Sequence, residues 1–447
     1  MSLDTIRELV NSGQYALLKS ELALMRAADI AEFLDELEPT TALVVFRLLP
    51  KDAAAMVFAY LSHERQTSLS QLANEVELSS IMEALFFDDK IDFLEEMPAN
   101  VVNQILRNSP ESERRLINQF LNYPENSAGS LMTIEYVALR PDQSAGEALA
   151  RIRQIAPRKE TIYTCYVTDS ERRLTGTVSL RDLVIADPET TVGQVMRLDP
   201  IRVTTHDDQE HIAGIFKKYD LLAIPVVDGE DRLVGIITID DIVDVIDQET
   251  TEDFHRMAAL VPSDEEYLNT SIMALARKRI VWLLVLMVSA TFTGYIIRSF
   301  ETTLASVVAL ATFIPMLMDT GGNAGSQAST LVIRSLILRE IELRDMLKVI
   351  WKEMQVSLLV GVGLAALNFV RIRFFEGYST PIALTVSATL VTTVMLAKIL
   401  GGVLPMVAQR LRLDPAIMAG PLITTIVDAV ALVVYFYLAR WFIGITV

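Results

Sequence analysis

Short apolar runs broken by proline fill the first part of the chain. In AEFLDELEP (31–39) and TALVVFRLLP (41–50), apolar residues recur at three- and four-residue spacing, which is the pattern of amphipathic helices. The run FLDEL at 33–37 recurs sixty positions later as FLEEM at 93–97. This internal repeat predicts an all-α superhelical domain over residues 1–127, built from stacked helical hairpins.

Over residues 128–251 the pattern changes to short β-rich runs that alternate with helices. The run YVTDSERRLTGTVSLRDLV, which ends at Val184, aligns with PVVDGEDRLVGIITIDDIV, which ends at Val243, at a constant offset of 59. Each copy has the pattern of a strand, a charged turn, a second strand and the start of a helix. The duplication predicts a pair of α/β modules. The copies share Asp169 with Asp228, Leu174 with Leu233, Gly176 with Gly235 and Asp182 with Asp241.

Long apolar stretches dominate the rest of the chain, after a polar connector over 252–276 that we predict to be helical. Crossing the hydrocarbon core takes ~20 residues of helix, and five stretches are long enough. We therefore predict a transmembrane bundle of five helices over 277–447, which makes the chain a multidomain protein of all-α, α/β and all-α transmembrane parts. The five stretches are 280–297, 304–338, 356–374, 381–407 and 416–445.

The two halves of the chain differ in charge. Residues 1–276 hold 48 acidic and 24 basic side chains, net −24, whereas residues 277–447 hold 9 and 15, net +6. So acidic a surface attracts cations and repels polyanions, which argues against a nucleic-acid partner. The four His and one Cys form no pattern of metal ligands or nucleophiles, so an enzyme is not expected.

The flanks of the predicted spans favour one orientation in the membrane. With the N-terminal half inside, ten Lys and Arg flank the inner ends and four flank the outer ends. No apolar signal segment opens the chain, and the lone Cys165 fits a reducing compartment. We expect a multi-pass protein in the lipid bilayer of the cell (inner) membrane, with cytoplasmic N-terminal domains.

A polar run lies inside the second predicted span. The sequence PMLMDTGGNAGSQAST (315–330) places Asp319 and Asn323 at membrane depth. A central Asp costs ~2.5–3.5 kcal/mol on translocon scales, so an intramembrane carboxylate marks a functional site by default. The alternative is that small residues and amides only pack this helix against its neighbours.

A second polar run, DPAIMAGPLITTIVDAV (414–430), lies in the fifth predicted span. It places Asp428 deep in the membrane, with Thr424 one turn earlier on the same helix face. We predict that Asp428 meets a cation. The alternatives are a protonated carboxyl group and an ion pair with Lys398 of the fourth span.

Acidic residues cluster at three places in the first half. Like charges at three- and four-residue spacing destabilise a helix unless cations bind between them, so these clusters are candidate sites for divalent cations. The alternative is that each run is a solvated face. The clusters are Asp88, Asp89, Asp92, Glu95 and Glu96; Asp207, Asp208 and Glu210; and Asp240, Asp241, Asp244, Asp247, Glu249, Glu252 and Asp253.

The duplicated modules resemble the CBS-domain pair over residues 130–251. In that family an adenine nucleotide such as ATP often binds between the copies, held by a Ser/Thr-x-x-Asp motif at the end of the last strand. The resemblance carries this role to Ser179 and Asp182, and to Thr238 and Asp241. The alternative is that these residues only cap helices.

The order of the parts, together with the two polar runs, resembles the MgtE family of magnesium transporters along the whole chain. The resemblance implies a homodimer that conducts Mg²⁺, with Asp428 lining the pore around a hydrated ion and Asn323 beside it. It also implies that Mg²⁺ bound to the acidic domains closes the pore. Two alternatives stay open, namely a carrier for other divalent ions such as cobalt or manganese, and a membrane-anchored nucleotide-sensing regulator.

Overall fold

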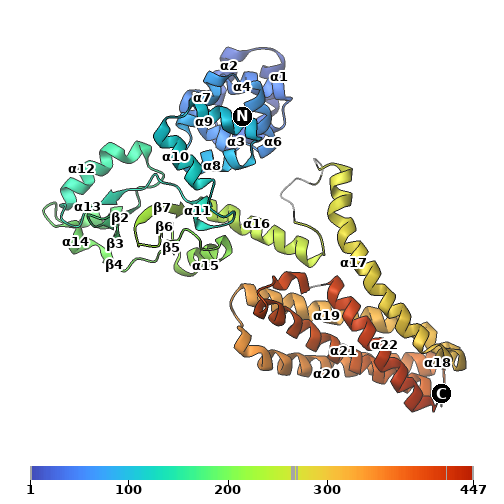
Figure 1. Cartoon of the computed structure of the whole chain (residues 1–447). Coiled ribbons are helices and arrows are strands. Elements are labelled where there is room, and N and C mark those ends of the chain that lie inside the picture. Colours follow the sequence, from blue (N-terminus) through green and yellow to red (C-terminus); the bar gives the residue numbers. More distant parts are fainter. Residues whose placement is uncertain (1–2, 263–266, 268–269, 419, 445–447) are drawn as a thin grey trace. The chain divides into compact units, whose positions relative to one another are not determined.

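A computed structural model describes residues 3–262, 267, 270–418 and 420–444 (Figure 1). By their internal contacts the residues fall into two compact units, Met1–Ile246 and Asp247–Val447. The first unit holds the predicted helical domain and the α/β pair, and the second holds the long apolar helices.

Ten short helices form the N-terminal domain, as the apolar spacing predicts. The predicted repeat is confirmed, because α8 begins sixty residues after α3 and the prolines Pro50 and Pro110 both stand at helix N-caps. The helices are α1 (Leu3–Asn11), α2 (Tyr15–Leu22), α3 (Ala27–Asp35), α4 (Pro39–Phe46), α5 (Lys51–Ala59), α6 (His63–Leu72), α7 (Glu75–Ala84), α8 (Phe87–Glu96), α9 (Ala99–Asn108) and α10 (Glu111–Phe120).

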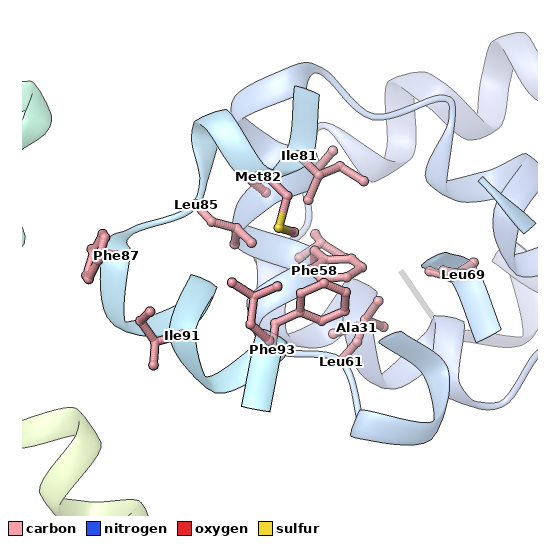
Figure 2. Close-up of a cluster of buried hydrophobic side chains, with 14 of the residues drawn as sticks. Ala31, Phe58, Leu61, Leu69, Ile81, Met82, Leu85, Phe87, Ile91 and Phe93 are labelled. Atoms are coloured by element: carbon pink, nitrogen blue, oxygen red, sulfur yellow. The ribbon is translucent and has the colours of Figure 1, made fainter. Parts of the chain in front are cut away.

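Aromatic side chains join the two repeats in one core. Figure 2 shows Phe58 of α5 and Phe93 of α8 pointing toward one another, and their rings meet edge to face with centroids 5.1 Å apart. Such pairs contribute about 0.5–1.5 kcal/mol beyond the burial of their area. The repeated phenylalanines Phe33 and Phe93 are both fully buried. The FL pairs in the sequence therefore mark the core side of the superhelix.

Two α/β modules follow the short helix α11 (Ala128–Leu131). The predicted offset of 59 is confirmed, because β6 and β7 begin 59 residues after β2 and β3. The first sheet has the order β1-β2-β3-β4 and the second β5-β6-β7. The elements are β1 (Ala138–Leu139), α12 (Ala145–Ile155), η1 (Ala156–Arg158), β2 (Thr164–Thr168), β3 (Leu174–Ser179), α13 (Leu180–Ile185), α14 (Val192–Val195), β4 (Arg197–Leu198), β5 (Val203–Thr204), α15 (Gln209–Tyr219), β6 (Ala223–Val227) and β7 (Leu233–Thr238).

Each module lends its first extended segment to the sheet of the other. Thr133 exchanges backbone hydrogen bonds with Ile236 of β7, and β4 pairs with β3. The repeated glycines stand where these segments cross. A Cβ on Gly176 would lie 2.7 Å from the Arg197 carbonyl oxygen, and one on Gly235 would lie 2.8 Å from that of Thr133. Only glycine allows so close a backbone approach.

Long helices form the second unit. Helix α16 (Ile239–Met257) begins in the second module and ends here. The remaining elements are α17 (Ile272–Ser299), α18 (Glu301–Ser306), η2 (Val308–Phe313), α19 (Ile314–Ile337), η3 (Leu343–Asp345), α20 (Met346–Val370), η4 (Arg371–Phe375), α21 (Thr380–Arg410), η5 (Pro415–Met418) and α22 (Pro421–Ile443).

The connector predicted as a helix over 252–276 is not one helix among the described residues; 263–266 and 268–269 lie outside them. Its first residues are the last turns of α16 and its last residues are the first turn of α17. Ala259 has a left-handed backbone with φ 54°, which ends the helix. Pro262 also lacks a donor N–H and disfavours a helical conformation in the residue before it.

Four helices in the described part of the chain are long and apolar enough to cross a membrane: Ile272–Ser299, Leu343–Phe375, Thr380–Arg410 and Pro415–Ile443. The second predicted span differs, because the stretch 304–338 is broken and only its later part forms the long helix α19. Pro315 lies in the first turn of α19, where proline is well tolerated. With 24 residues, α19 is long enough to cross, but it carries the polar run.

Glycines let α19 pack very closely against α21 and α22. A Cβ on Gly401 of α21 would lie 2.3 Å from the Gly325 carbonyl oxygen of α19. A Cβ on Gly321 would lie 2.7 Å from a methyl carbon of Thr393. Small residues at such contacts are typical of membrane helices, because dispersion forces between close backbones hold them together.

Gly401→Ala should push α19 and α21 apart, because no flexible atom can make way for the new methyl group. We expect the thermal midpoint of the detergent-solubilised chain to fall by several degrees, since overpacking costs about 1–3 kcal/mol. Gly363→Ala is the matched control, because no atom lies within 4 Å of the added Cβ. Equal midpoints for the two variants would contradict this packing.

Candidate functional site

The polar run of α19 forms one face of the helix. Asp319, Asn323 and Gln327 are spaced four residues apart, so they lie above one another, and all three are exposed in the single chain. On the opposite face, Gly321 and Gly325 are buried against α21 and α22. The helix therefore keeps its small residues inside the bundle and turns its amides and carboxylate outward.

Asp428 of α22 lies beside this polar face. It is the eighth residue of its helix, which places it about 10 Å along the helix axis. Its Oδ1 atom is buried without a hydrogen-bond partner in the described part of the chain, and its carboxylate is close enough to Asp319 for their charges to interact. Thr424, one turn earlier, packs against Gly322 of α19. Two carboxylates from different helices therefore share one region.

The alternative ion pair between Asp428 and Lys398 does not form among the described residues. Lys398 is buried in α21, with 6% of its surface exposed. Gly402, one turn later on its helix, faces Val349 and Glu353 of α20. A Cβ on Gly402 would also lie 3.8 Å from a methyl carbon of Val332 on α19. Asp428 thus keeps an unpaired carboxylate oxygen that a cation could satisfy.

A second group of carboxylates gathers in the first unit, between α8 and the start of α16. Burial and the charge of Asp241 raise the pKa of Asp92 to about 8, and burial together with Asp240 raises that of Asp89 to about 6. Burial, followed by Asp241, raises the pKa of Asp88 well above its usual range. The carboxylates of the two helices therefore repel one another when they are charged.

The basic residue of α8 does not neutralise this cluster. Lys90, on α8 between the aspartates, donates to Glu113 at 2.5 Å. In the part of the chain that the structure describes, no three acidic, His or Cys side chains are arranged to hold a metal ion. The cluster consists of oxygen ligands, which suit Mg²⁺ or Ca²⁺, but these oxygens do not yet converge.

Two members of this cluster were not predicted. Glu160 lies beside Asp240, and burial raises its pKa to about 8; its Oε2 atom is buried without a hydrogen-bond partner among the described residues. Glu135 also faces Asp89. Each is an isolated acid in the sequence, outside any acidic run, so no local signal marks it. Glu135 and Glu160 come close to the aspartates of α8 and α16 only when the chain folds.

The remaining predicted cation ligands lie elsewhere. Asp208 caps α15 by accepting the backbone N–H of Glu210 at 3.0 Å, which is the helix-cap role. Asp244 and Asp247 lie on the exposed side of α16. Glu252 forms an ion pair with Arg256, and Asp253 lies next to it on the same helix. For these residues metal binding stays a prediction.

The two Ser/Thr-x-x-Asp motifs have different surroundings. The Ser179 hydroxyl accepts the backbone N–H of Asp182 at 3.0 Å and so caps α13. The Thr238 hydroxyl instead donates to the Asp241 carboxylate at 2.9 Å. Burial and Asp240 raise the pKa of Asp241 to about 7, because this side chain belongs to the acidic cluster. Asp241 of the second motif is thus part of both the candidate nucleotide site and the candidate cation site.

Three family profiles match the chain, one of them twice. The MgtE divalent cation transporter profile matches residues 314–438, the MgtE intracellular N domain 25–126, and the CBS domain 128–189 and 192–248. A magnesium transporter MgtE from Thermus thermophilus is 38% identical over 98% of this chain and 97% of its own length. The chain belongs to the MgtE family of divalent cation transporters. A multi-pass membrane protein with soluble N-terminal domains, as predicted, follows from this membership and from the four apolar helices.

A second relative and two solved structures are also similar to this chain. A magnesium transporter MgtE from Bacillus subtilis is 32% identical over 94% of this chain and 96% of its own length. The crystal structure of the cytosolic domain of the Mg²⁺ channel MgtE in complex with ATP is similar, with a TM-score of 0.53 and 38% identity. It covers 55% of this chain and 100% of that one. The soluble part of a magnesium transporter gives a TM-score of 0.52 at 28% identity over 55% of this chain and 97% of that one. The predicted family and architecture are confirmed.

The acidic cluster predicts an unusual pH dependence of stability. Because folding raises the pKa of these carboxyls, stability is greatest below their unfolded pKa near 4 and falls as the pH rises through about 8. Without divalent ions, the cytoplasmic half of the full chain should resist thermal unfolding better at about pH 5.5 than at about pH 8. Asp92→Asn should reduce this difference, whereas the matched change at exposed Asp52 should not. A stability that rises across this range would contradict the cluster.

Proposed function

We propose that this chain conducts Mg²⁺ as a channel-like homodimer, with Asp428 at the ion pathway, and that Mg²⁺ bound to the acidic cluster closes it. The observation that carries the proposal is the exposed polar face of α19 beside the unpaired Asp428 oxygen. Membership of a divalent cation transporter family supports it.

The exposed face of α19 supports a second copy in the membrane. Asp319, Asn323 and Gln327 cannot face lipid cheaply, because the hydrocarbon core offers them no partners. The apolar helices around them leave water or protein as the only favourable surroundings. Two copies related by a two-fold axis would turn these faces toward each other and enclose a polar path. Each copy would add one Asp428 to that path.

The chemistry of the pathway suits a hydrated ion. Mg²⁺ sheds its water reluctantly and is usually held by one or two carboxylates with several waters retained. A pair of Asp428 carboxylates, with the amide oxygens of Asn323 near them, would accept hydrogen bonds from that water shell. The glycine-rich run GGNAG lacks the GK[ST] ending of an ATPase phosphate loop. We propose that transport runs down the electrochemical gradient.

The acidic cluster supports a sensor. Aspartates of α8 and of α16 repel one another, since each raises the pKa of others across the gap. Divalent ions between the helices would turn this repulsion into attraction and draw α8 toward α16. A ligand shifts an equilibrium only by its differential affinity for the two states, so several weak sites acting together suit a response to millimolar Mg²⁺.

We also propose an adenine nucleotide such as ATP at the α/β pair. The similar cytosolic domain at 38% identity was solved with ATP. Ser179 and Asp182 are half-buried at the start of α13. Since Asp241 belongs to both candidates, nucleotide and Mg²⁺ occupancy should influence each other.

Asp428→Ala should abolish Mg²⁺ flux into liposomes that contain the reconstituted full chain, because it removes the carboxylate from the pathway. Asn323→Leu should cut the flux sharply. Leu359→Ala, an exposed apolar residue on α20, is the control and should conduct normally. Normal flux through Asp428→Ala would contradict the proposed ion pathway. Flux of cobalt or manganese that exceeds that of Mg²⁺ would favour a carrier for those ions.

Mg²⁺ should protect the cytoplasmic half against proteases. We expect slower cleavage near residues 120–130 as Mg²⁺ rises through the millimolar range, because the domains close around bound ions. Asp88→Asn combined with Asp92→Asn should lose this protection and leave the pore open at high internal Mg²⁺. Cleavage that is the same with and without Mg²⁺ would reject the sensor even if flux is normal.

A further inference from the structure

The last turn of α16 is tied to the loop that leads into α22. Arg256 donates to Glu252, one turn earlier on α16, and to Asp414, which follows α21. Arg256 is the single Lys or Arg among the nineteen residues of α16. The side chains of Arg256, Glu252 and Asp414 are 34%, 22% and 21% exposed. This ion-pair triad is thus partly shielded from water, where charge-assisted bonds are stronger than on an open surface.

Asp414 is held on both of its oxygens. One oxygen accepts from Arg256, and Oδ1 accepts the backbone N–H of Ala416 at 2.7 Å. The second bond fixes the turn that opens η5, the short helix before α22. The Met418 carbonyl of η5 also accepts from the Ser329 hydroxyl of α19 at 3.4 Å. A force on Asp414 would therefore reach both α19 and α22.

Backbone packing supports the same contact independently. Gly420, the N-cap of α22, has φ +41°, and a Cβ there would lie 3.0 Å from the Met257 carbonyl oxygen of α16. The carbonyl end of α16 thus meets the N–H end of α22. Opposite ends of two helix dipoles attract, so this close approach is favourable. The contact requires glycine at position 420 in both conformation and space.

We infer that Arg256 is a built-in cationic clamp that positions α22, the helix carrying Asp428, against the end of α16. The clamp uses the protein's own guanidinium to bridge Glu252 and Asp414. The inference rests on the proposed function in one respect: the clamp stabilises the closed pore, so its loss raises the internal Mg²⁺ that closure needs.

Two single variants test the clamp from opposite sides. Arg256→Gln removes the cation, and Asp414→Asn removes the charge while keeping the Oδ1 acceptor for Ala416. Each should raise the Mg²⁺ concentration for half-closure in the flux assay by about threefold, the scale of a partly exposed ion pair. The double variant should match either single one, because both break the same interaction. Arg256→Lys should rescue in part, since an ammonium reaches one carboxylate at a time. Arg410→Gln, at the exposed end of α21, is the control.

A second readout does not depend on flux. Chymotrypsin cleavage after Leu260, just beyond α16, should quicken equally in Arg256→Gln and in Asp414→Asn, although position 414 is remote in sequence. Additive effects in the double variant, or cleavage and half-closure unchanged from the wild type, would overturn the clamp. If the cleavage results hold while Asp428→Ala still conducts, the clamp stands and the proposed pathway fails.

Discussion

The cost of placing polar groups at membrane depth governs the second unit. Asp319, Asn323 and Gln327 occupy one face of α19, and Asp428 lies beside them with an unsatisfied oxygen. Hydrocarbon has no hydrogen-bond partners for these groups, so this face must contact water, an ion or another protein surface. The glycines lie on the opposite face of α19, toward the inside of the bundle. They let α19 fit so closely against α21 and α22 that its polar side remains available.

In the first unit, the corresponding cost is that of bringing carboxyl groups close together. Its carboxylates are brought together between α8 and α16 until their charges raise one another's pKa values. A fold with no function at this place would gain stability by replacing one of these acids with a neutral residue. Their joint presence, with Lys90 already engaged by Glu113, is therefore a reason to expect a bound cation. Both units thus bring acidic side chains from different helices together at one place each.

The sequence predicts most of the fold because each part has its own periodicity. The 60-residue repeat gives the helical domain, the offset of 59 gives the sheets, and Asp169 and Asp228 indeed hold matching turns. The prediction is weakest where contacts are non-local. Glu135 and Glu160 carry no local signal, and the Arg256 to Asp414 contact joins residues 158 positions apart. The break after α16 also escapes a hydropathy argument, because it depends on the backbone at Ala259 and on Pro262.

Helix α16 gives the chain a mechanical connection between its two charged regions. Its first turn carries Asp240 and Asp241, which belong to the acidic cluster, and its last turn carries Arg256. Nineteen residues of continuous helix span about 28 Å, and a helix interior does not stretch or compress appreciably. Under the proposed sensor, charge neutralisation at the first turn of α16 would be transmitted along the helix to its last turn. A break inside α16 would uncouple the two ends, whereas the break after Met257 leaves α17 free to remain in the membrane while α16 moves.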